Sequence, residues 1–225
     1  MDKLTSIGVY NKLKNIDWTN CYGMITFDMA NVTTKITATD TVGMTLQSWL
    51  KEYFIKNNIY FREPPNTQEF PDFFLDESNF NHMLEVKSFN YNRSPAFDIA
   101  NFDSYCDSVK DAPYRLYADY LVFGYEMNKD AKIYIRDIWL KKIWEIAGTS
   151  KRFKLKTQVK RDVIYNIRPS SDFKYYRESP FKNETEFIDA LYHTIEKYKS
   201  SKEADEWLND FKNSYFNYYN KKFNI

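Results

Sequence analysis

Cysteine, histidine and glycine are scarce in this sequence. Its 225 residues include two Cys, two His and five Gly. Nowhere does it contain a run of about 18 apolar residues, the length that a transmembrane helix needs, so we expect no membrane span. The first residues lack the apolar stretch and small-residue cleavage site of a secretory signal. These absences predict an intracellular, cytoplasmic protein.

The few cysteines and histidines also exclude several kinds of site. Cys21 and Cys106 are too few for a disulfide framework or a four-sulfur zinc site, so we expect reduced thiols. His82 and His193 share no metal-ligand spacing, and we expect both to have structural roles. Zinc chemistry and histidine-based catalysis are therefore disfavoured.

Aromatic residues, in contrast, are abundant. Tyr, Phe and Trp make up 19% of the chain, and a bulky core is favoured over a base-stacking role. The formal net charge is only +1, so the protein as a whole does not attract nucleic acid. Any nucleic-acid function must depend on local patches.

Apolar periodicity predicts a mixture of helices and strands. The predicted helices cover residues 4–13, 43–57, 97–109, 138–146, 184–198 and 202–219. The predicted strands cover residues 59–62, 70–76, 82–89, 118–126 and 132–136, with extended segments at 24–41 and 153–167. This order predicts an α/β fold with one central mixed sheet flanked by helices, and additional helices at the C-terminal end.

Two adjacent predicted strands carry a group of charged residues. Asp72 opens one strand, and Glu85 and Lys87 lie on the next. Because strand side chains alternate, Leu84 and Val86 share an apolar face and the two charged residues share the other. Asp72 and Glu85 can each offer an oxygen to a hard divalent cation, with the Val86 carbonyl as a further ligand.

This grouping suits phosphodiester hydrolysis. A metal ion lowers the pKa of an attacking water, and a cation such as Lys87 stabilises the phosphoryl oxygens. Oxygen ligands favour Mg²⁺, with Mn²⁺ as a substitute, over zinc. The alternative is a surface Asp beside a solvated Glu/Lys pair. The apolar opposite faces and the order of the elements favour the catalytic interpretation.

The residues around this group also resemble a known family. The runs 66–73 and 84–89 (NTQEFPDF and LEVKSF) look like the core of the PD-(D/E)xK nucleases. More narrowly, residues 95–106, together with short segments at 114–116, 118–121, 138–140 and 165–169, resemble type II restriction endonucleases of the NgoBV/NlaIV kind. The similarity covers roughly residues 43–170.

The resemblance implies a restriction-endonuclease-like fold and a specific activity. Asp72 and Glu85 would bind the metal, and Lys87 would assist the water. A homodimer would cut double-stranded DNA at a short palindrome, with GGNNCC as the candidate site, leaving 5′-phosphate and 3′-hydroxyl ends. A cognate DNA methyltransferase would be a genetic rather than a physical partner. We expect one nuclease domain over residues 1–225, with the catalytic core at about 43–147.

Two residues of the preceding helix could complete the site. Glu52 is similar in placement to an acidic residue that some of these nucleases use as an auxiliary ligand, although a solvent-facing role is equally compatible with the sequence. Gln47 is a weaker candidate for the same role.

A basic segment at 151–168 could hold DNA. It places six cations in eleven residues without an acid: Lys151, Arg152, Lys154, Lys156, Lys160 and Arg161. Phe153, Leu155 and Val159 alternate with three of these lysines, so a strand here would have one apolar and one basic face. A solvated Lys-rich face is the alternative. Given the nuclease motif, phosphate binding is favoured.

The loop at 90–94 contains groups that can read base edges. Asn92 lies in it, and Arg93 is the best single candidate, because a guanidinium can bind guanine through two hydrogen bonds. Arg115, Arg136 and Arg168 are rivals, unless they form structural ion pairs. At the level of function, a junction-resolving or repair nuclease of the same core and a non-catalytic nucleic-acid-binding module remain alternatives.

Overall fold

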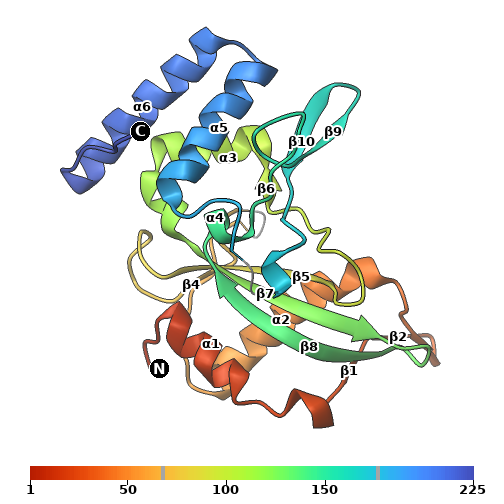
Figure 1. Ribbon diagram of the computed structural model, residues 1–225. Helices are drawn as coiled ribbons and strands as arrows, with labels where there is room; N and C mark the ends of the chain where they lie inside the picture. The colour runs from red at the N-terminus through yellow and green to blue at the C-terminus, as the bar shows by residue number, and fades with distance from the viewer. Residues whose placement is uncertain (67–68, 176–177) are drawn as a thin grey trace. The chain divides into compact units, whose positions relative to one another are not determined.

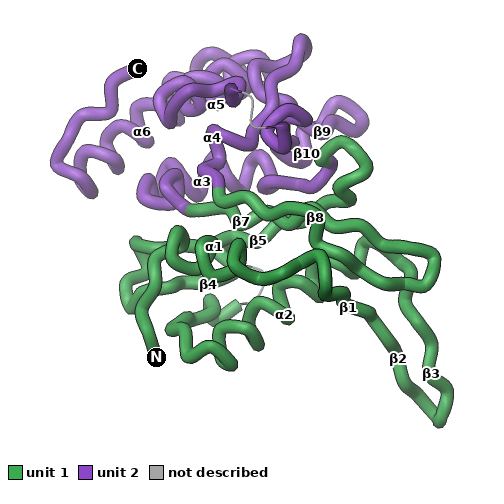
Figure 2. Tube along the Cα trace, turned by 60° about the horizontal axis from the view of Figure 1, so that its bottom comes forward, with its two compact units in different colours: residues 1–95, 119–140 green, residues 96–118, 141–225 purple. Residues whose placement is uncertain are grey.

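The computed structural model describes residues 1–66, 69–175 and 178–225. It divides into two compact units, coloured separately in Figure 2. Unit 1 comprises residues 1–95 and 119–140, and unit 2 comprises residues 96–118 and 141–225. Asp72, Glu85 and Lys87 all belong to unit 1. The expectation of one nuclease domain over the whole chain stays a prediction.

Unit 1 is built on a mixed five-stranded sheet (Figure 1). Its strands, in spatial order, are β1 (Gly23–Met24), β8 (Lys132–Lys141), β7 (Asp119–Met127), β5 (Met83–Asn90) and β4 (Phe73–Phe74). β5 and β7 run parallel, whereas β4 is antiparallel to β5 and β1 to β8. This sheet confirms the predicted mixed α/β class.

The core of unit 1 lies between this sheet and its helices, α1 (Ser6–Lys14) and α2 (Val42–Lys56). The buried stripe of α2 consists of Val42, Leu46, Leu50 and Phe54, which recur every fourth residue and therefore lie on one helix face. Leu84 and Val86 of β5 belong to the same apolar cluster. Their burial determines which side of β5 carries Glu85 and Lys87, because successive side chains alternate.

A two-stranded hairpin extends from unit 1. β2 (Thr26–Met29) and β3 (Val32–Lys35) pair antiparallel, joined by Ala30 and Asn31 at φ 51° and 62°. Positive φ at both central residues is typical of the tight turns that join such strands. The extended prediction for 24–41 is confirmed here, up to the 3₁₀ turn η2 (Thr39–Thr41). A second such turn in unit 1, η1, covers Trp18–Asn20.

Unit 2 is mostly helical. Its helices are α3 (Phe102–Asp111), α4 (Ile143–Ile146), α5 (Glu184–Tyr198) and α6 (Ser201–Tyr219), with 3₁₀ turns η3 (Pro113–Tyr117) and η4 (Phe173–Tyr175). A three-stranded sheet has the order β6 (Ala100–Asn101), β10 (Val163–Ile167), β9 (Thr157–Lys160). The C-terminal helices are confirmed, and the Asn183 side chain caps α5 by accepting from the Glu186 N–H at 3.0 Å.

Several predicted elements are wrong in kind or extent. Residues 59–62 form isolated bridges rather than a strand, the strand at 70–76 shrinks to β4, and the helix predicted from residue 97 begins at Phe102. The helix predicted over 138–146 is wrong in its first half, because residues up to Lys141 extend β8. The basic segment is a hairpin rather than one extended strand, since Arg161 and Asp162 turn at φ 52° and 62°.

The structure also bears on two exclusions made from the sequence. Within the described part of the chain, no helix has both the length and the apolar character needed to cross a membrane. Both cysteines are free thiols, as predicted, and Cys106 is buried.

Candidate active site

The two carboxylates converge because β4 and β5 pair directly. Phe73 lies opposite Leu84, so the residue before β4 lies next to Glu85. The Asp72 N–H donates to Glu85 Oε2 at 3.2 Å, and the Val86 N–H donates to Asp72 Oδ2 at 2.7 Å. The Asp72 carboxylate is therefore held against the neighbouring strand. Thr67 and Gln68 of the motif lie outside the described residues.

Lys87 completes the group. Its Nζ lies 2.9 Å from Glu85 Oε1. Both side chains belong to the same strand and point to the same face, as the alternation predicts. Glu85 is only 9% exposed, so this ion pair is largely shielded from solvent. The structure thus brings together Asp72, Glu85 and Lys87, which we call the acidic corner.

Electrostatics in the acidic corner favour a positive ion. Burial, and then the nearby charge of Glu85, raise the pKa of Asp72 to about 7, against the pull of the Val86 N–H and Lys87. An aspartate with such a pKa is only partly ionised at neutral pH, because its charged form is costly in this site. A cation bound between the two carboxylates would relieve this cost.

The donor set suits a hard divalent cation. Magnesium is commonly bound by one or two carboxylates and keeps several waters. Within the described residues, no cluster of three Asp, Glu, His or Cys side chains could hold a metal, and the acidic corner offers two carboxylates. The Val86 N–H is directed at Asp72, and in a strand the N–H and C=O of one residue face the same side. The Val86 carbonyl therefore points to the same edge of β5 as the Val86 N–H, the edge on which Asp72 lies.

Gln47, and not Glu52, reaches this site from α2. Gln47 Nε2 donates to Asp72 Oδ1 at 2.8 Å. At about 100° per residue, Gln47 lies about 80° from the middle of the buried stripe of α2 and Glu52 about 140°. Glu52 is accordingly exposed and does not join the acidic corner. The helical periodicity could have ranked these two residues correctly.

The base-reading candidates differ in how they are held. Asn92 and Arg93 are exposed in the turn after β5, where Asn90 Oδ1 accepts from the Asn92 N–H at 3.0 Å. The three rival arginines are all engaged: Arg115 with Ser108, Arg136 with Glu126, and Arg168 with Asp98. The base-contacting role of Asn92 and Arg93 stays a prediction.

The basic hairpin, as we call residues 151–167 of unit 2, shows part of the predicted alternation. Phe153 and Leu155 are buried and Lys154 is exposed. Lys156 is turned inward: its Nζ donates to the Pro169 carbonyl at 3.0 Å, and burial lowers its pKa.

Arg152, Lys154 and Lys160 of the basic hairpin are exposed. Arg152 pairs with Asp162 at 2.9 Å, just beyond the acid-free run. Lys160 is exposed, with its Nζ 5.6 Å from the Tyr165 ring centre. Lys154 and Lys160 are therefore the predicted DNA-contacting lysines that are open to a partner.

Each of the two histidines has contacts within its own unit. His82 occupies the turn before β5, with its carbonyl accepting from the Leu75 N–H at 3.0 Å. His193 on α5 lies 3.0 Å from Glu196 and 3.6 Å from Asp189. Both have local contacts of the structural kind expected from the sequence.

Comparison with known proteins identifies the family. The model of the NgoBV restriction endonuclease family matches residues 3–225. The type II restriction enzyme NlaIV of Neisseria lactamica is 34% identical over 230 residues, covering 100% of this chain and 95% of that enzyme. The type II restriction enzyme NgoBV of Neisseria gonorrhoeae is 37% identical over 151 residues, 65% of this chain and 84% of that enzyme.

A solved structure agrees with the sequence comparisons. The NlaIV restriction endonuclease has a TM-score of 0.90 to this chain at 34% identity, covering 100% of this chain and 94% of that one. Family model, relatives and structure point in one direction, and each spans all or most of the chain. The chain therefore belongs to the NgoBV restriction endonuclease family and is a type II restriction endonuclease.

Proposed function

We propose that this enzyme hydrolyses double-stranded DNA at a short palindromic site in a Mg²⁺-dependent reaction, with Mn²⁺ able to substitute. The observation that carries the proposal is the convergence of Asp72, which directly precedes β4, with Glu85 and Lys87 of the neighbouring strand β5. GGNNCC is the candidate site, supported by the sequence resemblance. Family membership speaks against the junction-resolving nuclease and the non-catalytic module.

Each residue of the acidic corner has a distinct role in this proposal. Asp72 and Glu85 would hold the cation, with the Val86 carbonyl as a further ligand. The bound ion would lower the pKa of a water and neutralise charge on the phosphate. Lys87, held beside Glu85, would orient that water and stabilise the phosphoryl oxygens. Gln47 would fix the orientation of the Asp72 carboxylate through its hydrogen bond.

The reaction itself requires no covalent enzyme intermediate. Water attacks the scissile phosphorus in line while the 3′-oxygen leaves on the opposite side. The products are a 5′-phosphate and a 3′-hydroxyl end. The protein's contribution is the positioning of charged groups, which is what the acidic corner supplies.

DNA binding and assembly complete the proposal. Asn92 and Arg93 would contact base edges, and the basic hairpin would contact phosphates, with Lys154 and Lys160 exposed and Arg152 and Lys156 supporting. A homodimer with twofold symmetry would match a palindromic site. A methyltransferase of the same specificity would protect the host DNA. We place the enzyme in the cytoplasm, where that DNA is.

A plasmid digest tests the proposal. Wild-type enzyme should give discrete fragments with Mg²⁺ and none with EDTA, and sequencing of the ends should reveal one palindrome. Lys87→Ala should abolish cutting, whereas Lys12→Ala, an exposed lysine of the same unit, should not. Cutting in EDTA, or by Lys87→Ala at the wild-type rate, would refute the mechanism. A different palindrome would refute GGNNCC alone.

A further inference from the structure

The β2–β3 hairpin has two unlike faces. The register pairs Phe27 with Thr34 and Met29 with Val32, and cross-strand partners share a face. Phe27, Met29 and Val32 therefore form one apolar face. The alternate pairs, Thr26 with Lys35 and Asp28 with Thr33, form a polar face. We call residues 26–35 the arm.

The apolar face of the arm is uncovered. Phe27 is 51%, Met29 66% and Val32 67% exposed, and every strand residue of the arm is exposed. Figure 2 shows the arm extending away from the rest of unit 1. An isolated two-stranded hairpin is marginally stable, and alternation of this kind is typical of a hairpin with one packed face. The sequence of the arm is thus suited to packing against another surface.

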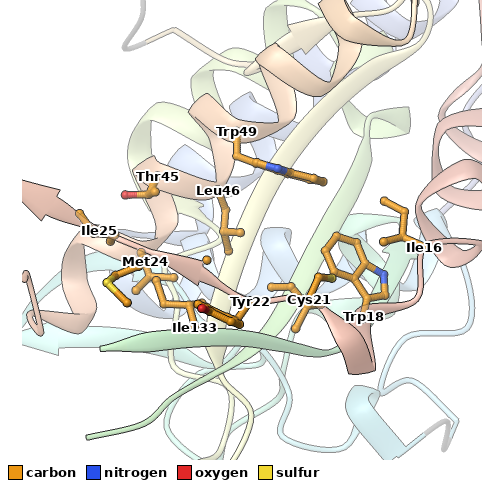
Figure 3. A pocket seen from close by; sticks show the side chains of 13 residues that line it. Ile16, Trp18, Cys21, Tyr22, Met24, Ile25, Thr45, Leu46, Trp49 and Ile133 are labelled. Carbon is orange, nitrogen blue, oxygen red and sulfur yellow. The ribbon is translucent and has the colours of Figure 1, made fainter. Parts of the chain in front are cut away.

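A pocket of matching chemistry lies in the same unit. It has a volume of about 390 Å³ and lies between the segment preceding the arm, α2 and β8. Its walls include Ile16, Trp18, Leu46, Trp49 and Ile133, and Figure 3 shows these side chains gathered around it. Pockets of roughly 300–1,000 Å³ take up ligands of drug size, so this one has room for a few side chains. We call it the apolar pocket.

Charge distinguishes between possible partners of the arm. Its strands contain one acid, Asp28, and one base, Lys35, so they have no net charge. A DNA-binding arm needs cations to pair with phosphates, and the apolar face has none. An apolar protein surface is the better match, and this chain itself provides one.

We propose that the arm docks through Phe27, Met29 and Val32 into the apolar pocket of a second copy of this chain. In a twofold dimer the contact occurs twice, so both arms and both pockets become covered. The inference rests on the homodimer of the proposed function, for which it supplies the contact surface. It does not depend on the chemistry of the acidic corner.

The first experiment measures dimerisation without DNA or metal. Wild-type enzyme should sediment as a dimer. The triple variant Phe27→Ser, Met29→Ser, Val32→Ser should have a dimer dissociation constant at least roughly a hundredfold higher, because it no longer buries three large apolar side chains. The polar-face variant Thr26→Ala, Asp28→Ala, Lys35→Ala is the control and should dimerise like wild type. Circular dichroism checks that each variant is folded.

The second experiment locates the arm by disulfide formation. Cys21 lines the apolar pocket, and the other cysteine, Cys106, is buried. Met29→Cys should give a covalent dimer on oxidation, and adding Cys21→Ser should remove it. Thr33→Cys, on the polar face, is the control and should not cross-link.

Each other outcome overturns the inference. If the triple apolar variant dimerises like wild type, the arm is not the contact. If it also binds DNA more weakly, the arm contacts DNA instead. If oxidised Met29→Cys instead forms an intramolecular disulfide with Cys21 in a monomer, the arm folds back on its own chain. Because sedimentation and cross-linking use no DNA, their failure leaves the proposed hydrolysis intact, whereas a wild-type dimer that does not cut DNA would count against the hydrolysis alone.

Discussion

The acidic corner and the basic hairpin both contain charged side chains, but the two regions use them differently. In the acidic corner each carboxylate oxygen has a protein donor, and Lys87 is paired with Glu85. On the basic hairpin, Lys154 and Lys160 are exposed to solvent. Among the described residues, neither is in an ion pair.

This difference teaches what kind of function each region can have. Groups held against one another in a buried corner act together in catalysis, so the loss of one should stop the reaction. Exposed cations act almost independently, and each adds a small, salt-dependent share to DNA affinity. Large and salt-independent effects should therefore come from the acidic corner, and small graded effects from the basic hairpin.

The largest effect should come from neutralising a carboxylate of the acidic corner. Glu85→Gln preserves the shape of the side chain but removes the charge that would hold the cation, so we expect cleavage to slow by at least roughly 10³-fold. The rate is measured on plasmid DNA with saturating Mg²⁺. Glu52→Gln, an exposed glutamate of the same unit, is the control and should cut as wild type does. An equal loss in both variants would contradict the separation of Glu52 from the site.

The pH dependence of stability should come next. Asp72 in the folded state has a pKa of about 7, against an ordinary value of 3.8. Between these values the folded state binds a proton that the unfolded state has released, so the free energy of unfolding falls as pH rises from about 4 to about 7. The total change is on the order of 4 kcal/mol.

Urea unfolding in EDTA, repeated across this pH range, measures that change. Asp72→Asn should flatten the profile and raise stability at alkaline pH, because it removes the buried charge. Asp76 is the control: a hydrogen bond from the Ser78 N–H lowers its pKa, so Asp76→Asn should leave the fall between pH 4 and 7 in place. A rise in stability over that range would mean that Asp72 is not held protonated.

Gln47 should show an intermediate effect. Gln47→Met keeps the length of the side chain but removes the hydrogen bond to Asp72. Loss of a group that orients a metal ligand typically weakens metal affinity by roughly 10–100-fold. The cleavage rate should therefore require more Mg²⁺ and recover at saturation. If saturating Mg²⁺ does not restore the rate, Gln47 does more than orient Asp72.

The smallest effects should come from single lysines of the basic hairpin. Lys154→Ala or Lys160→Ala should weaken DNA binding a few-fold and reduce the slope of log affinity against log salt by about 1. Cleavage at saturating DNA should not change. Lys202→Ala, at an exposed lysine of α6, is the control for general charge. If Lys154→Ala or Lys160→Ala cannot cut at saturating DNA, the basic hairpin contributes to catalysis and not only to DNA affinity, which would contradict the difference drawn between the two regions.

The acidic corner could be predicted from sequence because it is local. β4 and β5 are close along the chain and pair directly, so strand alternation alone places Asp72, Glu85 and Lys87 together. The contact of Gln47 crosses from a helix to a distant strand, and spacing within one element cannot show it. The position of Glu52 opposite the buried stripe was readable from helical periodicity.

The incorrectly predicted elements have physical reasons as well. The apolar residues from Ile138 onward fit a helix, but the neighbouring strand β7 provides hydrogen-bond partners that extend β8 instead. The turn of the basic hairpin is made by Arg161 and Asp162, without the Gly or Pro that marks most turns. Tertiary partners and an unusual turn therefore account for what the local pattern could not predict.

Metal binding tests the central claim most directly. Electron paramagnetic resonance of Mn²⁺ titrated into the enzyme with a short duplex counts the bound ions without requiring cleavage. We predict that wild type and Lys87→Ala bind the ion at the acidic corner, and that Asp72→Asn and Glu85→Gln each bind it far more weakly. Undiminished Mn²⁺ binding by Asp72→Asn and Glu85→Gln would contradict the assignment of these two carboxylates as the metal site.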